Sequence, residues 1–124
     1  MGTLRPIAAL SWLFFLFTAG AVDSASPLQM HVTPTISRAP AWVRVRVMVA
    51  AGPDDRMLRV IAESPSYYRA SEVPLEGTRS QPLNVFEFKN LPTGTYDIRA
   101  VLVDGSGPRA SAQGLARVEP GFGS

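Results

Sequence analysis

Few residues of this sequence have side chains that could carry chemistry. His31 is the only histidine, and the chain contains no cysteine. A catalytic triad needs a histidine beside a serine or cysteine nucleophile, and no Gly-x-Ser-x-Gly motif supplies the serine. We therefore predict no catalytic residue and interpret His31 as a solvent-facing side chain. Met30 and His31 could contribute to a soft metal site, since thioether and imidazole bind soft metals, but no second histidine or cysteine accompanies them.

Acidic residues offer a second possible site. Asp54 and Asp55 are adjacent in one predicted turn, and Asp104 lies in another turn that we expect at the same end of the fold. Calcium takes six to eight oxygen ligands, so three acids would form only a weak cation site. Aspartate is also common in turns because its side chain hydrogen-bonds the nearby backbone. We favour this second interpretation and predict neither a metal nor a cofactor.

Tyr67, Tyr68 and Arg69 are the best candidates for a partner surface. Tyrosine and arginine are enriched in the residues that dominate binding energies at interfaces. An equally good interpretation is that one of the tyrosines packs over the edge of a sheet, because tyrosine is intermediate in its burial statistics.

The elements that must position these residues are predicted to be strands. Residues 42–50 give the clearest signal, since four valines alternate with Arg44, Arg46 and Met48. Such alternation with β-branched residues is typical of a half-buried strand. Weaker alternation predicts strands over residues 28–32, 57–63, 83–89 and 109–118, with a turn over 35–40. Residues 64–81 predict one or two short edge strands.

The stretch from Leu91 to Gly107 organises the prediction. In a predicted strand, Tyr96, Ile98, Ala100 and Leu102 alternate with Asp97, Arg99, Val101 and Val103. Asp104-Gly105 follows it and suits a tight hairpin, because glycine accepts positive φ without steric cost. The strand over residues 109–118 would have small residues on its inward side. These residues would let it lie close to its neighbours; alternatively, the strand would have a bulge at Gly114.

This stretch resembles the E–F corner and F strand of fibronectin type III and related immunoglobulin-like domains. The resemblance rests on Leu91-Pro92-x-Gly94-x-Tyr96-x-Ile98 and on Phe86 and Phe88 before it. It implies that Leu91, Gly94 and Tyr96 form a structural corner, in which the Tyr96 hydroxyl bonds the backbone between residues 91 and 94. Together with the strand pattern, it implies an all-β, seven-stranded antiparallel sandwich.

The domain organisation is predicted to be simple. Residues 1–21 have the order of a signal peptide: Arg5, an apolar core over 7–17, and small residues before a cleavage site after Ala21 or Ala25. Residues 22–27 would be a leader, 28–119 the sandwich and 120–124 a tail. We expect a secreted or periplasmic protein that meets a membrane only through an uncleaved signal segment.

Composition and motifs limit the functions that we expect. The net charge is +2 with dispersed arginines, which predicts no nucleic-acid binding. We predict an exported, non-enzymatic binding or structural module of the cell envelope or extracellular space, with an unknown protein or glycan partner. The alternative is a metal-handling or carbohydrate-processing accessory protein that uses the loop acids and His31. A third possibility is one part of a larger system whose partner carries the chemistry.

Overall fold

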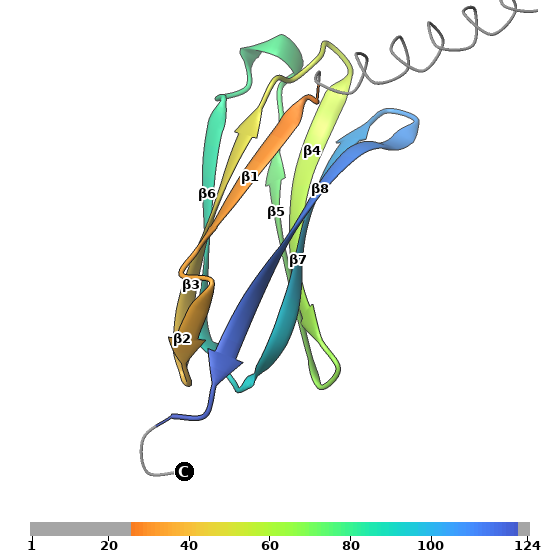
Figure 1. Ribbon diagram of the computed structural model, residues 1–124. Coiled ribbons are helices and arrows are strands. Elements are labelled where there is room, and N and C mark those ends of the chain that lie inside the picture. Colours follow the sequence, from red (N-terminus) through yellow and green to blue (C-terminus); the bar gives the residue numbers. More distant parts are fainter. Residues whose placement is uncertain (1–25, 122–124) are drawn as a thin grey trace, which may run out of the picture.

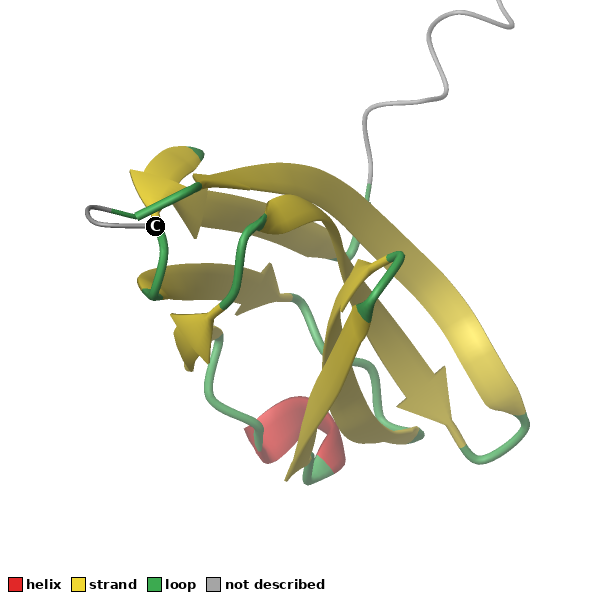
Figure 2. Ribbon diagram, turned by 90° about the horizontal axis from the view of Figure 1, so that it is seen from below, coloured by secondary structure: helices red, strands yellow, loops and turns green. Residues whose placement is uncertain are grey.

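A computed structural model of the chain describes residues 26–121. These residues form eight strands in two facing sheets (Figures 1 and 2). The strands are β1 (Leu28–Thr33), β2 (Ile36–Arg38), β3 (Ala41–Val49), β4 (Asp55–Ser64), β5 (Tyr67–Pro74), β6 (Leu83–Leu91), β7 (Gly94–Asp104) and β8 (Gly107–Glu119), and one 3-10 turn, η2, spans Gly77–Arg79. The predicted signal peptide and both of its cleavage sites lie outside the described residues.

The two sheets contain three and five strands, in the orders β1-β3-β6 and β2-β8-β7-β4-β5. All neighbours are antiparallel except β2, which runs parallel to the end of β8. The predicted all-β sandwich is confirmed, but the count of seven strands is wrong. The extra strand is β2, which we had expected to be part of a turn. Its three residues are too few for a periodic signal and form a strand by pairing with β8. No helix within residues 26–121 is long and apolar enough to cross a membrane.

The core lies between the two sheets, as the alternating burial of β3 shows. Its odd-numbered residues from Ala41 to Val49 are buried, whereas its even-numbered residues are exposed. Successive strand residues point to opposite faces, so the four valines fill one side of the interface. Burying such a side chain contributes about 1.5–3 kcal/mol. From the facing sheet, β4 and β7 contribute a second set of fully buried residues: Leu58, Val60, Ala62, Tyr96, Ile98, Ala100 and Leu102.

The small residues of β8 let the two sheets meet along one edge. A Cβ at Gly114 would lie 3.2 Å from both Met30 Cε and Val32 Cγ2 of β1. A side chain at this position would therefore require Met30 and Val32 to shift by a few tenths of an ångström. The close approach that we expected is confirmed, and the alternative of a bulge at Gly114 is wrong. The irregularity in the β7–β8 pairing lies instead between Leu102 and Val103.

The β7–β8 hairpin turns one residue later than we predicted. Asp104 pairs with Gly107, which leaves Gly105 and Ser106 as the two-residue loop. The positive φ of 124° belongs to Gly107. The Asp104 carboxylate accepts a hydrogen bond of 2.7 Å from the Ser106 N–H, which explains an aspartate at the start of this turn.

The predicted corner at the other end is present. Leu91 and Tyr96 are fully buried, and the Tyr96 hydroxyl donates a hydrogen bond of 2.7 Å to the Pro92 carbonyl oxygen. The buried setting raises the pKa of this hydroxyl, which therefore stays a donor. The Tyr67 ring packs edge-on against the Tyr96 ring at 5.9 Å. This corner ties the β6–β7 connection to the core.

We expect substitutions at Tyr96 to rank by what they remove. Tyr96→Phe loses the hydrogen bond and should cost about 0.5–1.5 kcal/mol. Tyr96→Ala also empties the volume of the ring and should cost about 3–5 kcal/mol. The neighbouring Asp97 is exposed, so Asp97→Ala should change little. Denaturant unfolding measures all three, and a silent Tyr96→Phe would show that the corner hydrogen bond contributes nothing.

Candidate functional site

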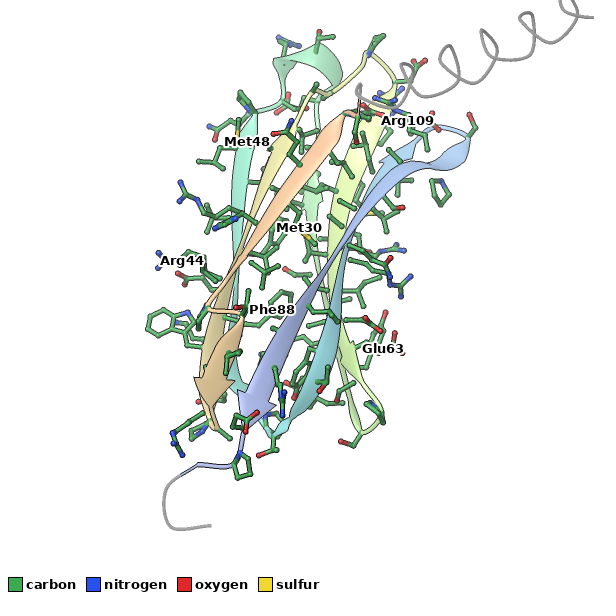
Figure 3. The ribbon with its side chains drawn as sticks, in the orientation of Figure 1. Met30, Arg44, Met48, Glu63, Phe88 and Arg109 are labelled. Atoms are coloured by element: carbon green, nitrogen blue, oxygen red, sulfur yellow. The ribbon has the colours of Figure 1, made fainter. Side chains whose placement is uncertain are left out.

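The outer face of the three-stranded sheet is the most unusual surface of the described residues. Its side chains form cross-strand rows, such as His31–Arg46–Val85 and Gln29–Met48–Leu83. Four large apolar residues are exposed here, and Figure 3 shows Arg44 and Met48 pointing away from the core. We call this surface the outer face; its members are Gln29, His31, Thr33, Trp42, Arg44, Arg46, Met48, Leu83, Val85, Glu87 and Lys89.

The charge of the outer face is unbalanced. Arg44 pairs with Glu87 at 3.0 Å, whereas Arg46 has no carboxylate within ion-pair distance among residues 26–121. Lys89 lies over the Trp42 ring at 5.0 Å from its centre. The face thus carries three fixed cations and one acid.

The facing sheet is different. Three of its arginines pair with acids on its own surface: Arg59 with Glu72, Arg99 with Glu63 and Arg117 with Glu119. The facing sheet thus has more surface ion pairs than the outer face, where Arg44 alone has a carboxylate partner among residues 26–121.

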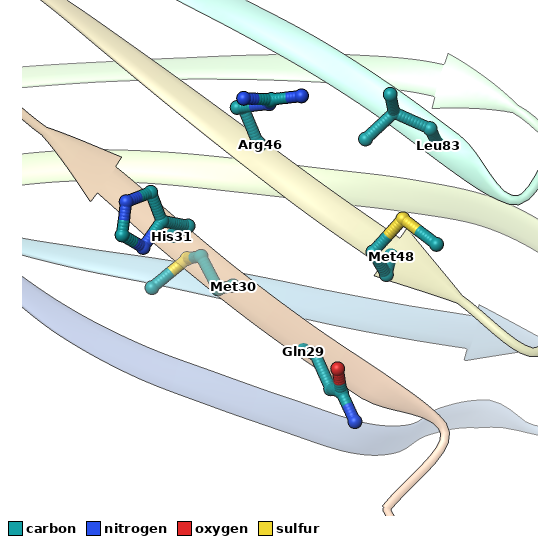
Figure 4. A pocket seen from close by; sticks show the side chains of 6 residues that line it. All are labelled: Gln29, Met30, His31, Arg46, Met48 and Leu83. Atoms are coloured by element: carbon teal, nitrogen blue, oxygen red, sulfur yellow. The ribbon is translucent and has the colours of Figure 1, made fainter.

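A shallow depression of about 360 Å³ crosses β1 and β3 near the start of β1 (Figure 4). It is lined by Gln29, Met30, His31, Arg46, Met48 and Leu83. His31 makes no hydrogen bond to any residue between 26 and 121, so both of its ring nitrogens are available to a ligand. Met48 is 46% exposed on the neighbouring strand. The depression therefore offers one imidazole and the thioether of an exposed methionine.

A second open depression, of about 470 Å³, lies at the opposite end of β3. Thr33 and Pro34 line it from the end of β1, and Trp42 and Arg44 line it from β3. Trp42 is 55% exposed, which is unusual for the largest apolar side chain. The alternation of residues 42–50 already places Trp42 on the same face as Arg44, and this signal was missed in our reading of the sequence.

The loop acids do not form a cation site. Asp55 is fully buried and binds Arg109 through two hydrogen bonds of 2.8 Å (Figure 3 labels Arg109). Its Oδ2 also accepts the Gly52 N–H. Hydrogen bonding to Arg109, aided by Gly52, lowers the pKa of Asp55. Asp55 and Asp104 are partners in the β4–β7 pairing, at the same end of the fold as predicted. The Asp55 carboxylate, however, is already occupied by the Arg109 guanidinium.

Arg109 was not foreseen because it lies 54 residues from Asp55, and no local pattern joins them. Asp54 is exposed in the β3–β4 loop. Within residues 26–121, no group of three or more His, Cys, Asp or Glu side chains could hold a metal ion.

The predicted partner surface divides into three environments. Tyr67 is half-buried against Tyr96, and Arg69 stacks on the Tyr67 ring at 5.7 Å. Arg69 also donates a hydrogen bond of 3.4 Å to the Lys89 carbonyl oxygen, which links β5 to β6. Tyr68 and Arg69 are both exposed, and Tyr68 makes no such contact with residues 26–121. A role for Tyr67, Tyr68 and Arg69 in partner binding stays a prediction.

Comparisons with known proteins identify a shared fold and no family. No protein-family model matches the chain, and no curated protein sequence matches it. A superoxide reductase (neelaredoxin) from Ignicoccus hospitalis superposes with a TM-score of 0.59 and 19% identity, over 74% of this chain and 80% of that chain. A singly substituted form of the same reductase gives a TM-score of 0.61 and 18% identity, over 82% of this chain and 86% of that chain. A family 76 glycoside hydrolase from a bovine Bacteroides thetaiotaomicron strain gives 0.52 and 16%, over 77% of this chain and 21% of the hydrolase.

These comparisons correct two predictions. We expected a non-enzymatic binding or structural module and no enzyme, but the similar structures are enzymes. The alternative of a metal-handling or carbohydrate-processing accessory protein agrees better with them. The fold is that of an all-β sandwich found in superoxide reductases, and the comparisons do not point to fibronectin type III domains specifically.

The residues of this chain do not fit a resident redox metal. Reduction of superoxide transfers an electron, and proteins hold redox-active transition metals mainly through histidine, cysteine and carboxylate ligands. The whole chain has one histidine and no cysteine. Its shared fold with superoxide reductases is therefore not accompanied by a ligand set of that kind.

We expect the Asp55–Arg109 pair to be the most sensitive polar contact. Asp55→Asn removes the carboxylate that accepts both hydrogen bonds from Arg109. Because Arg109 itself is exposed and the substitution leaves no buried charge behind, we expect a loss of about 1.5–3 kcal/mol, the range for hydrogen bonds to charged groups. Denaturant unfolding measures the cost, and Asp54→Asn, an exposed neighbour, is the matched control.

The pH dependence follows from the lowered pKa of Asp55. A carboxyl whose pKa is lower in the folded than in the unfolded state stabilises the fold above its unfolded pKa of about 3.9. This contribution is lost as the pH falls through the folded pKa. The stability difference between wild type and Asp55→Asn should therefore be largest near pH 7 and shrink below about pH 4. A difference that stays constant down to about pH 2 would contradict this assignment.

Proposed function

We propose that the chain is an exported metal-handling protein that binds a soft monovalent cation, Cu(I), loosely on its outer face. The observation that carries the proposal is the β1–β3 depression, which both His31 and the exposed Met48 line (Figure 4). Imidazole and thioether are ligands that favour copper over hard cations such as calcium and magnesium. The fold shared with superoxide reductases supports a metal-related function at the level of architecture.

The geometry favours exchange of the ion over its retention. The depression is open, its metal ligands come from two strands, and no carboxylate lines it. Arg46 projects into the same depression and lowers the affinity for any cation, most strongly for divalent ions. Such a site suits a carrier that receives and releases a metal ion, and it does not suit a permanent redox centre.

Silver, a redox-stable substitute for Cu(I), provides the test. His31 is the only histidine, so its ring gives one set of NMR signals. Titration of the purified protein with Ag(I) should shift these signals and the Met48 methyl signal together at one equivalent. Calcium should leave both unchanged, because neither side chain offers the oxygen ligands that calcium prefers.

Variants assign the ligands. His31→Ala and Met48→Leu should each weaken Ag(I) binding at least tenfold. Met57→Leu is the matched control, because Met57 lies on β4 in the other sheet. This variant should bind Ag(I) with the affinity of the wild type. Retention of wild-type affinity by both His31→Ala and Met48→Leu would overturn the proposal. Thermal melts should show all three variants folded, since surface substitutions change stability by about 0.5 kcal/mol or less.

A further inference from the structure

We propose that the Trp42 end of the outer face binds an acidic polysaccharide, a linear glycan with carboxylates on its sugar rings. This inference is independent of the metal proposal. It rests on the depression that Thr33, Pro34, Trp42 and Arg44 line, and on Arg46 and Lys89, two cations of the outer face without an ion pair among residues 26–121.

Trp42 supplies a stacking platform for a sugar ring. Lys89 belongs to β6 and holds one side of the indole by a cation–π contact at 5.0 Å. Trp42 also lines the depression, together with Thr33 and Pro34 at the end of β1. An indole that is 55% exposed offers a large, flat apolar surface. The apolar face of a pyranose ring, formed by its C–H groups, can lie flat on such a surface.

The Arg44–Glu87 pair supplies polar groups suited to sugar hydroxyls. Arg44 Nε and Nη2 both donate to Glu87 Oε2, at 3.3 and 3.0 Å. Glu87 Oε1 makes no hydrogen bond to residues 26–121, so it can accept from a ligand. A sugar hydroxyl both donates and accepts, and here it meets a guanidinium donor and a carboxylate acceptor on adjacent strands. Thr33 adds a hydroxyl in the same cross-strand row.

The excess positive charge specifies an acidic glycan. Arg46 follows Arg44 on the same face of β3, about 7 Å further along the strand. It has no acidic partner among the described residues, and Lys89 has only the Trp42 ring and backbone contacts around it. Carboxylates on successive units of a linear polymer could therefore meet cations in a row. Arginine can bind a carboxylate through two parallel hydrogen bonds, which makes the interaction specific in orientation as well as favourable in charge.

Other anionic polymers fit this face less well. A nucleic-acid interface uses many more phosphate contacts than three cations provide. An acidic peptide has no sugar ring that could lie flat on the exposed indole, and few hydroxyls that could use both the Arg44 donor and the Glu87 acceptor. A sugar polymer uses the indole, the acceptor and the cations together.

Calorimetric titration with oligogalacturonate, dextran and poly-glutamate tests the proposal. We expect oligogalacturonate to bind, and the neutral glucan and the acidic peptide to bind at least tenfold more weakly. Trp42→Ala and Arg46→Ala should each weaken oligogalacturonate binding at least fivefold. The matched control is Arg99→Ala, which removes an exposed arginine from the other sheet.

Each other outcome contradicts the proposal in a defined way. Equal binding of poly-glutamate would show attraction by charge alone, and stronger binding of dextran would exclude an acidic glycan. Unchanged oligogalacturonate binding by Trp42→Ala would show that the indole is not a stacking platform. Absence of oligogalacturonate binding by the wild type would overturn the proposed site. Ag(I) binding by Trp42→Ala should stay at the wild-type level, which separates failure of this site from failure of the metal site.

Discussion

The contact between β1 and β8 is the constraint on which the sandwich depends. β1 belongs to the three-stranded sheet and β8 to the five-stranded sheet, yet the glycine at position 114 lets the two strands come together. This contact closes one edge of the core, so that Met30 and Val32 pack against the other sheet. At the other edge, Arg69 of β5 reaches the backbone of β6. Both edges thus join the sheets without a disulfide, as a chain with no cysteine requires.

Closure of the core at these edges leaves the outer face of the smaller sheet uncovered. The even-numbered side chains of β3 are all exposed, so no segment between residues 26 and 121 covers them. Apolar side chains on such a face gain nothing from the core, and their presence there needs another explanation. The opposite sheet carries more ion pairs on its surface. The exposed Trp42 and Met48, together with Arg46, which has no ion pair among residues 26–121, are the features that favour a binding surface here.

The sequence predicted those parts of the structure that a period of two residues encodes. Alternation predicted the inward valines of β3, the buried positions of β7 and the small inward residues of β8. A local motif predicted the corner role of Tyr96. β2 could not be predicted, because three residues carry no period and their pairing with β8 is a tertiary contact. The Asp55–Arg109 pair could not be predicted either, because it is also a tertiary contact between residues far apart in the sequence. The two depressions depend on which strands become neighbours, so the sequence alone did not show that His31 and Met48 line the same depression.

Strand β3 serves the core and both proposed sites without conflict between them. Its odd-numbered positions are fixed by the core, and a slip of one residue would place arginines between the sheets. Register is therefore strongly determined, and the even-numbered side chains are held at a constant spacing of about 7 Å by the same backbone. Because these side chains contribute little to the core, they can change without loss of the fold. A rigid strand with one constrained and one free face is thus a suitable scaffold for ligand binding, and it places the metal ligands and the stacking ring at its opposite ends.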